Sequence, residues 1–215
     1  MKKILITISL SVFCILFSTA IFAQESKTEF GIKAGINLMD DNIFSNIYPG
    51  IHAGVFAEYT FNNFVGIQSE LLYSMLGSKS SIFSGYGDGS EIIKSTYKTG
   101  YIVLPVLAKL YVVKKLSIDL GPQFGYIISS RYKTKITNEE LLNELRNDGI
   151  IIGDRNDYDE IDDKFNVSFA AGLSYKIGNR FSVSGRYNLA LTKFHMNGFG
   201  FKENAVQFSI GYRLK

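Results

Sequence analysis

The chain has 215 residues, of which 46% are hydrophobic and 14% aromatic, and its formal net charge is +3. The 23 basic and 20 acidic residues nearly balance, and this argues against a nucleic-acid partner. The length suits one domain, and 20 glycines with 17 Phe, 13 Tyr and only 3 Pro favour a β-rich chain.

The first 23 residues have the layout of a secretory signal peptide. Lys2 and Lys3 precede an apolar run that ends in small residues, so we expect export and cleavage after Ala23. One domain, 24–215, then remains. Cys14, the single cysteine, would be lost with the leader, and the exported chain is expected to contain no disulfide.

Apolar and polar residues alternate with a period of two in eight segments, which predicts eight β-strands. In the first segment, Ile32, Ala34 and Ile36 share one parity, and Lys33 and Asn37 share the other. In chain order, the predicted strands span about 29–39, 51–61, 65–76, 102–112, 118–129, 165–177, 181–191 and 206–214.

The connections between these segments alternate between short and long. Tight turns are expected at 62–63, 113–115 and 178–180. Long loops are expected at about 40–50, 77–100, 130–164 and 192–203. This is the layout of an all-β, eight-stranded antiparallel up-and-down transmembrane β-barrel, with short periplasmic turns and long extracellular loops.

The residues at the polar positions of the alternating strands indicate which face of the barrel is inside. These positions are rich in Gly and Ser, which suit an eight-stranded lumen just wide enough to be filled by side chains. Single charges of both signs also occur there, and we expect them to pair inside the barrel, although an ion or proton path is the alternative. These charged residues are Lys33, Glu58, Glu70, Lys109, Asp119, Lys176, Arg186 and Arg213. A soluble lipocalin-like barrel, with its apolar face inward around an apolar ligand, is the alternative fold.

Several segments resemble the PorT-like outer-membrane β-barrels of Gram-negative bacteria. They are GIKAGIN from residue 31, AGVFAEYTF from 53, IQSELLYSMLG from 67, YIVLPVLAKLY from 101, DLGPQFGY from 119, GRYNLALT from 185 and SIGYRL from 209. The resemblance implies an integral outer-membrane barrel, and the family's namesake is associated with protein secretion across that membrane. It also implies outer-membrane lipid, lipopolysaccharide and the barrel assembly machinery as partners. Leu214 departs from the aromatic residue that often ends such barrels.

Other candidate sites are weaker, and no catalytic, cofactor or metal site is expected. The segment 138–148 predicts a short helix, and the acidic segment 154–163 partly resembles a calcium loop but lacks its central Gly, so cation binding stays a hypothesis. His52 and His195 have no nucleophile or carboxylate at a recognisable spacing. We therefore expect a non-enzymatic barrel that is structural or binds a protein partner through its loops, with a lipid-modifying barrel enzyme as an alternative.

Overall fold

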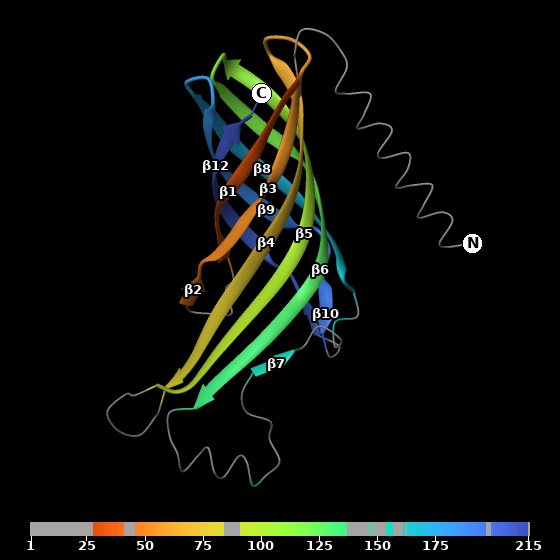
Figure 1. The fold of residues 1–215 in the computed structure, drawn as a ribbon. Helices are drawn as coiled ribbons and strands as arrows, with labels where there is room; N and C mark the ends of the chain where they lie inside the picture. Colours follow the sequence, from red (N-terminus) through yellow and green to blue (C-terminus); the bar gives the residue numbers. More distant parts are fainter. Residues whose placement is uncertain are drawn as a thin grey trace, which may run out of the picture.

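In the computed structural model the chain forms a closed antiparallel barrel (Figure 1). The structure describes residues 28–40, 46–83, 91–136, 147, 154–156, 161, 163–196 and 199–214. Each barrel strand pairs with its neighbour in the chain, and the first strand pairs with the last, so the predicted fold class is confirmed. The barrel strands are β1 (Thr28–Asp40), β3 (Gly50–Thr60), β4 (Val65–Phe83), β5 (Glu91–Val113), β6 (Leu116–Ile136), β8 (Phe165–Ile177), β9 (Phe181–Ala190) and β12 (Asn204–Arg213).

Four short strands lie in the long connections and were not predicted. β2 (Asn46–Tyr48) pairs with β4, and β7 (Asp154–Asn156) pairs with β6. β10 (Phe194–Met196) pairs with β11 (Phe199–Phe201) in a separate two-stranded sheet. The predicted signal peptide lies outside the described residues, as does the predicted helix apart from a single residue. None of the helical structure in the described part of the chain is long and apolar enough to span a membrane.

The three predicted tight turns lie together at one end of the barrel, where β1 begins and β12 ends (Figure 1). In the first turn, the Asn62 side chain accepts hydrogen bonds from the backbone nitrogens of Phe64 and Val65 at 2.8 and 2.9 Å. In the third turn, Gly178 has a φ of 60°, a left-handed conformation that glycine adopts at little cost. These local features explain why the turns could be predicted.

The predicted bounds of β4, β5 and β6 were wrong, because these strands continue far into the segments expected to be loops. They contain 19, 23 and 21 residues, against 10 in β9 and 10 in β12. In Figure 1 they project beyond the other strands at the end opposite the tight turns. The projecting part is rich in Ser, Thr, Tyr and Lys at both parities of its sequence, so the apolar alternation that predicted the rest of each strand is absent there.

One irregularity in the β5–β6 pair changes the faces of β6. Gly100 pairs with Ser129 but Tyr101 pairs with Ile127, so Ile128 is an extra residue in β6. A bulge of this kind exchanges the inward and outward parities of the strand beyond it. Accordingly Ile127 and Ser130 are both completely buried, although their parities differ.

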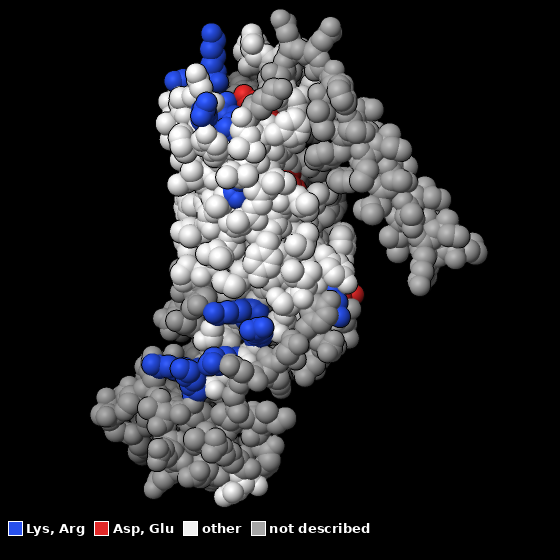
Figure 2. Space-filling view, in the orientation of Figure 1, with Lys and Arg blue, Asp and Glu red and all other residues white. Residues whose placement is uncertain are grey.

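The apolar face is outside and the polar face is inside. Along β12 the exposed fractions are 2% for Gln207, 49% for Phe208, 5% for Ser209 and 61% for Ile210. Figure 2 shows a broad band nearly free of charged side chains between charged groups at the two ends. An apolar outer band around a polar lumen suits a barrel surrounded by lipid, and it is the reverse of the lipocalin-like alternative, which is therefore wrong.

Candidate functional site

The lumen near the tight turns holds a chain of ion pairs. Arg213 Nη1 donates to Glu29 at 2.9 Å, and Lys176 Nζ lies between two carboxylates, 3.0 Å from Glu29 and 2.8 Å from Glu58. Tyr111 donates its hydroxyl hydrogen to Glu58. Lys109 Nζ lies 3.5 Å from the same carboxylate. These residues come from five strands, so the cluster ties the barrel wall together across its interior.

Asp119 is the second acidic residue beside Lys109. Its Oδ1 lies 3.4 Å from Lys109 Nζ and accepts a hydrogen bond from Ser117 at 2.7 Å. Ser174 donates to its other oxygen. Lys109 Nζ also donates to Gln68 Oε1 at 3.0 Å, which links this cluster to the next layer of the lumen.

The middle of the lumen is organised around Glu70, which is 1% exposed. Arg186 forms a bidentate pair with it, through Nη2 at 2.8 Å and Nη1 at 3.1 Å. Lys33 Nζ and Gln68 Nε2 donate to the same carboxylate at 2.9 and 2.6 Å. Glu70 therefore pairs with two buried cations, and pairing is the condition under which buried ions are tolerated.

A neutral layer of hydrogen bonds follows towards the projecting end. His52 is 1% exposed and lies between Asn37 Oδ1, 2.9 Å from Nδ1, and Ser209 Oγ, 2.8 Å from Nε2. Asn37 Oδ1 accepts only, so Nδ1 carries the proton and Nε2 accepts from the serine hydroxyl. Gln207 Nε2 also donates to Asn37 at 3.1 Å, and Asn37 donates to Ser74 at 3.0 Å. His52 is thus held in a structural layer.

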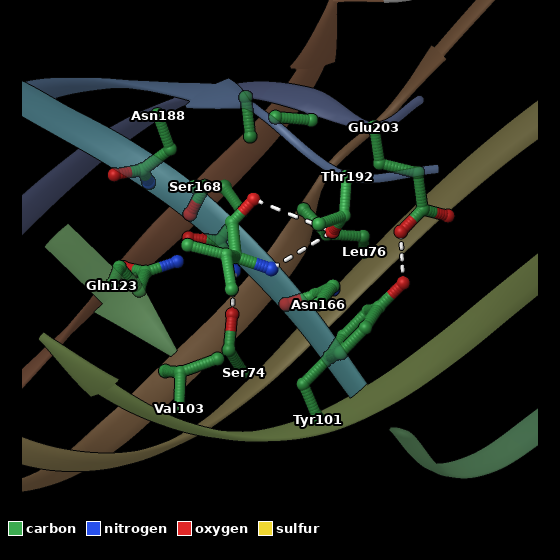
Figure 3. Close-up of a pocket in the computed structure, with 14 residues that line it drawn as sticks. Ser74, Leu76, Tyr101, Val103, Gln123, Asn166, Ser168, Asn188, Thr192 and Glu203 are labelled. Atoms are coloured by element: carbon green, nitrogen blue, oxygen red, sulfur yellow. Dashed lines mark hydrogen bonds between the residues drawn. The ribbon is translucent and has the colours of Figure 1, made fainter. Parts of the chain in front are cut away.

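Beyond this layer lies a polar cavity of about 40 Å³, shown in Figure 3. Tyr101 donates its hydroxyl hydrogen to Glu203 at one side. Asn188 Oδ1 and Gln123 Oε1 are buried and have no hydrogen-bond partner among the described residues. The volume fits about three water molecules, which would supply those partners. Tyr101 also belongs to an apolar cluster with Leu72, Val103, Ile127 and Ile161, the last of which lies in the long β7–β8 connection.

The structure places every charged residue of the predicted lumen set inside the barrel and brings all of them into the two ionic clusters. Sequence reasoning missed Glu29, which bridges Arg213 and Lys176. Glu29 has the same parity as Lys33, which was the available signal, but it lies at the first residue of the predicted strand. His195 lies in β10, and its side chain is outside the described residues. In the described part of the chain no group of three His, Cys, Asp or Glu residues is placed to hold a metal ion.

The family model described as outer membrane protein beta-barrel domain matches residues 22–196. The chain belongs to this family. Proteins of the outer membrane beta-barrel domain family lie in the outer membrane, which agrees with the apolar outer band. No curated protein matches the sequence.

Solved structures of outer-membrane barrels are similar to this family member at low identity. The attachment invasion locus protein Ail of Yersinia pestis is 13% identical, with a TM-score of 0.43, covering 87% of this chain and 97% of that one. Neisserial surface protein A is 12% identical, with a TM-score of 0.48, covering 88% and 97%. Outer Membrane Protein W of E. coli is 12% identical, with a TM-score of 0.36, covering 89% and 100%.

We expect no resolved single-channel steps from the purified barrel in planar lipid bilayers. The Glu70 and Glu58 clusters fill the lumen with paired side chains, and an eight-stranded barrel leaves no continuous aqueous path. The matched variant replaces both Glu70 and Arg186 by Ser, which removes two of the large side chains of the middle layer. Steps seen with the variant alone would show that these side chains close the lumen, whereas steps with the natural protein would contradict the expectation.

Proposed function

We propose that the protein is a non-enzymatic outer-membrane barrel that presents a projecting sheet outside the cell as the contact surface for a protein partner. The projecting sheet is defined as 77–83 of β4, 91–100 of β5 and 129–136 of β6. The observation that carries the proposal is the length of this projecting sheet. Ten residues of β5 precede Tyr101, and an extended chain rises about 3.3 Å per residue, so this strand continues for roughly 30 Å along its own direction beyond the barrel.

The projecting sheet is ordered by its own side chains. On its inner face Ser130 donates to the Tyr97 hydroxyl at 3.2 Å, and Tyr132 donates to Ser95 Oγ at 2.8 Å. β2 and β7 add short pairings at its two margins. A polar surface with tyrosines on a paired β framework suits protein recognition, because few side-chain rotamers must be ordered on binding.

The direction of insertion follows from the connections. Short turns face the periplasm in outer-membrane barrels and long segments face outward, which supports an extracellular sheet. An outward sheet would lie in the lipopolysaccharide leaflet after insertion by the barrel assembly machinery. The motifs that resemble PorT-like barrels support membership of that branch and a link to protein secretion.

A photo-crosslinking amino acid at Thr134, on the projecting sheet, should capture a discrete protein in intact cells. The same group at Lys115, in a tight turn, is the control and should not capture it. The product should disappear when residues 80–95 are deleted, since this shortens the β4–β5 hairpin above the Lys79–Thr96 pair and leaves the barrel residues in place. Heat-modifiable gel mobility checks that the shortened barrel folds.

Two results would contradict the proposal. One is the absence of a Thr134-specific product. The other is a product that persists after the deletion. A changed membrane lipid composition in cells that lack the protein would contradict the non-enzymatic part and would favour the lipid-modifying alternative.

A further inference from the structure

A second, smaller cavity of about 20 Å³ lies inside the lumen and borders both ionic clusters. We call it the basic cavity. Among the described residues that line it, Lys33, Lys109, Lys176 and Arg213 are cationic and Glu58 alone is acidic. Glu58 is already engaged by Lys176 at 2.8 Å and by Lys109 at 3.5 Å. The wall of the basic cavity therefore carries an excess of positive charge.

The two ionic clusters contain more cations than carboxylates. The cations are Lys33, Lys109, Lys176, Arg186 and Arg213, and the carboxylates are Glu29, Glu58, Glu70 and Asp119. The neighbouring layer around His52 is neutral and offers no further carboxylate. One positive charge is therefore left over within the clusters. A buried charge without a counter-charge is costly, so an anion bound among these cations would stabilise the barrel.

The wall of the basic cavity also offers hydrogen-bond donors that no described residue accepts. The Arg213 side chain is 10% exposed, and its Nη1 donates to Glu29, but its buried Nε has no acceptor in the described part of the chain. Ser182 and Ser184 lie two positions apart on β9, so their hydroxyls share the luminal face, and neither donates to another described group. An anion can accept from all three donors at once.

The size of the basic cavity restricts the anion to a single atom. One water molecule needs about 10–15 Å³ of such volume, so about 20 Å³ holds an ion slightly larger than water but not a phosphate, a sulfate or a carboxylate. The space depends on Gly211, which lies opposite Ser182 in the register, because a Cβ atom there would lie 2.5 Å from Ser182 Oγ. Lys176 and Arg213 are 18% and 10% exposed, so solvent ions can reach this end of the lumen.

We propose that the basic cavity binds one chloride ion, which accepts hydrogen bonds from Ser182, Ser184 and Arg213 and offsets the excess positive charge of the ionic clusters. Lys33 of β1, the two serines of β9 and Arg213 of β12 all line the cavity. β12 pairs with both β1 and β9, so the ion strengthens the seam at which the barrel closes. This inference goes beyond the proposed function and is independent of the partner and of the direction of insertion.

The test measures urea unfolding of the full-length protein in lipid vesicles while sodium chloride replaces sodium gluconate at constant ionic strength. Gluconate is too large for the basic cavity. An ion that binds only the folded state stabilises it more as its concentration rises, so the urea midpoint should increase with chloride and also with bromide. Crystals of the folded protein grown in sodium bromide should show an anomalous scattering peak among Ser182, Ser184 and Arg213.

Two variants test the donors and the charge separately. Ser182→Ala with Ser184→Ala removes two hydroxyls that bond no other described group, and it should weaken chloride binding by at least about tenfold, because hydrogen bonds to ions are strong. Lys33→Met makes cations and carboxylates equal in number and should abolish the effect of chloride, while Glu70 keeps its bidentate pair with Arg186. Ser168→Ala is the matched control, since this luminal serine lines the other cavity, and it should keep the full effect.

Three results would overturn the proposal. Equal midpoints in chloride and gluconate would show that chloride does not bind the folded barrel. An unchanged effect of chloride in the double serine variant would place the ion elsewhere. A bromide peak missing from the basic cavity would show that water fills it. If Lys33→Met does not fold, the serine variant decides alone. The Thr134 crosslink is independent of these measurements, so the partner proposal keeps its own test.

Discussion

Replacing Glu70 by Ala is expected to lower the free energy of unfolding by about 3–5 kcal/mol, because it leaves two buried cations without their carboxylate. Arg186 forms a bidentate pair with Glu70, and Lys33 donates to the same group at 2.9 Å. All three side chains are almost completely buried, so water cannot replace the lost partner. Urea unfolding in lipid vesicles, followed by heat-modifiable gel mobility, measures the loss.

Glu29→Gln is the matched control for this prediction. Glu29 also binds two cations, Lys176 and Arg213, but its side chain is 27% exposed and the pairs are partly screened by water. The expected loss is below about 1 kcal/mol. A double-mutant cycle between Glu70→Ala and Arg186→Met isolates their coupling energy. Equal losses for Glu70→Ala and Glu29→Gln would show that the middle cluster does not stabilise the barrel.

The contents of the lumen could be predicted from parity, but the partners of each residue could not. A charged residue such as Glu70 in an alternating strand must lie on the polar face, because lipid excludes it from the other. Which cation it meets depends on strand tilt and register around the whole barrel. Arg186 lies 116 positions away in the chain, and no local pattern relates the two residues.

The projecting sheet was missed for a related reason. Alternation with a period of two arises because one face of a strand contacts lipid and the other faces the lumen. This difference ends where a strand leaves the lipid. The segments 77–83 and 91–100 are rich in Ser, Thr, Tyr and Lys at both parities, so their sequence resembles a loop although the two strands pair there. The bulge at Ile128 was also invisible, because Ile127 and Ile128 are equally apolar and either could face outward.

Adding a single methyl group at Gly35 is expected to destabilise the barrel by about 3 kcal/mol or more, whereas the same change at Gly185 should alter stability by less than about 1 kcal/mol. A Cβ atom at Gly35 would overlap the carbonyl oxygen of Phe208 and lie 2.6 Å from His52 Cε1. A Cβ atom at Gly185 would meet only the Phe208 ring, at an ordinary 3.5 Å.

Gly35 and Gly185 differ in what occupies the space beside their Cα atoms. Gly35 lies directly opposite His52 in the β1–β3 register, and the space it leaves is occupied by the imidazole that joins Asn37 to Ser209. Gly35→Ala therefore pushes the ring out of both hydrogen bonds as well as crowding the wall, and each broken buried bond adds its own cost. Gly185 leaves its space on the lipid side, where a methyl group has room. Urea unfolding of both variants compares them directly, and equal stability would show that the lumen is not packed tightly enough at Gly35 for its small residues to be required.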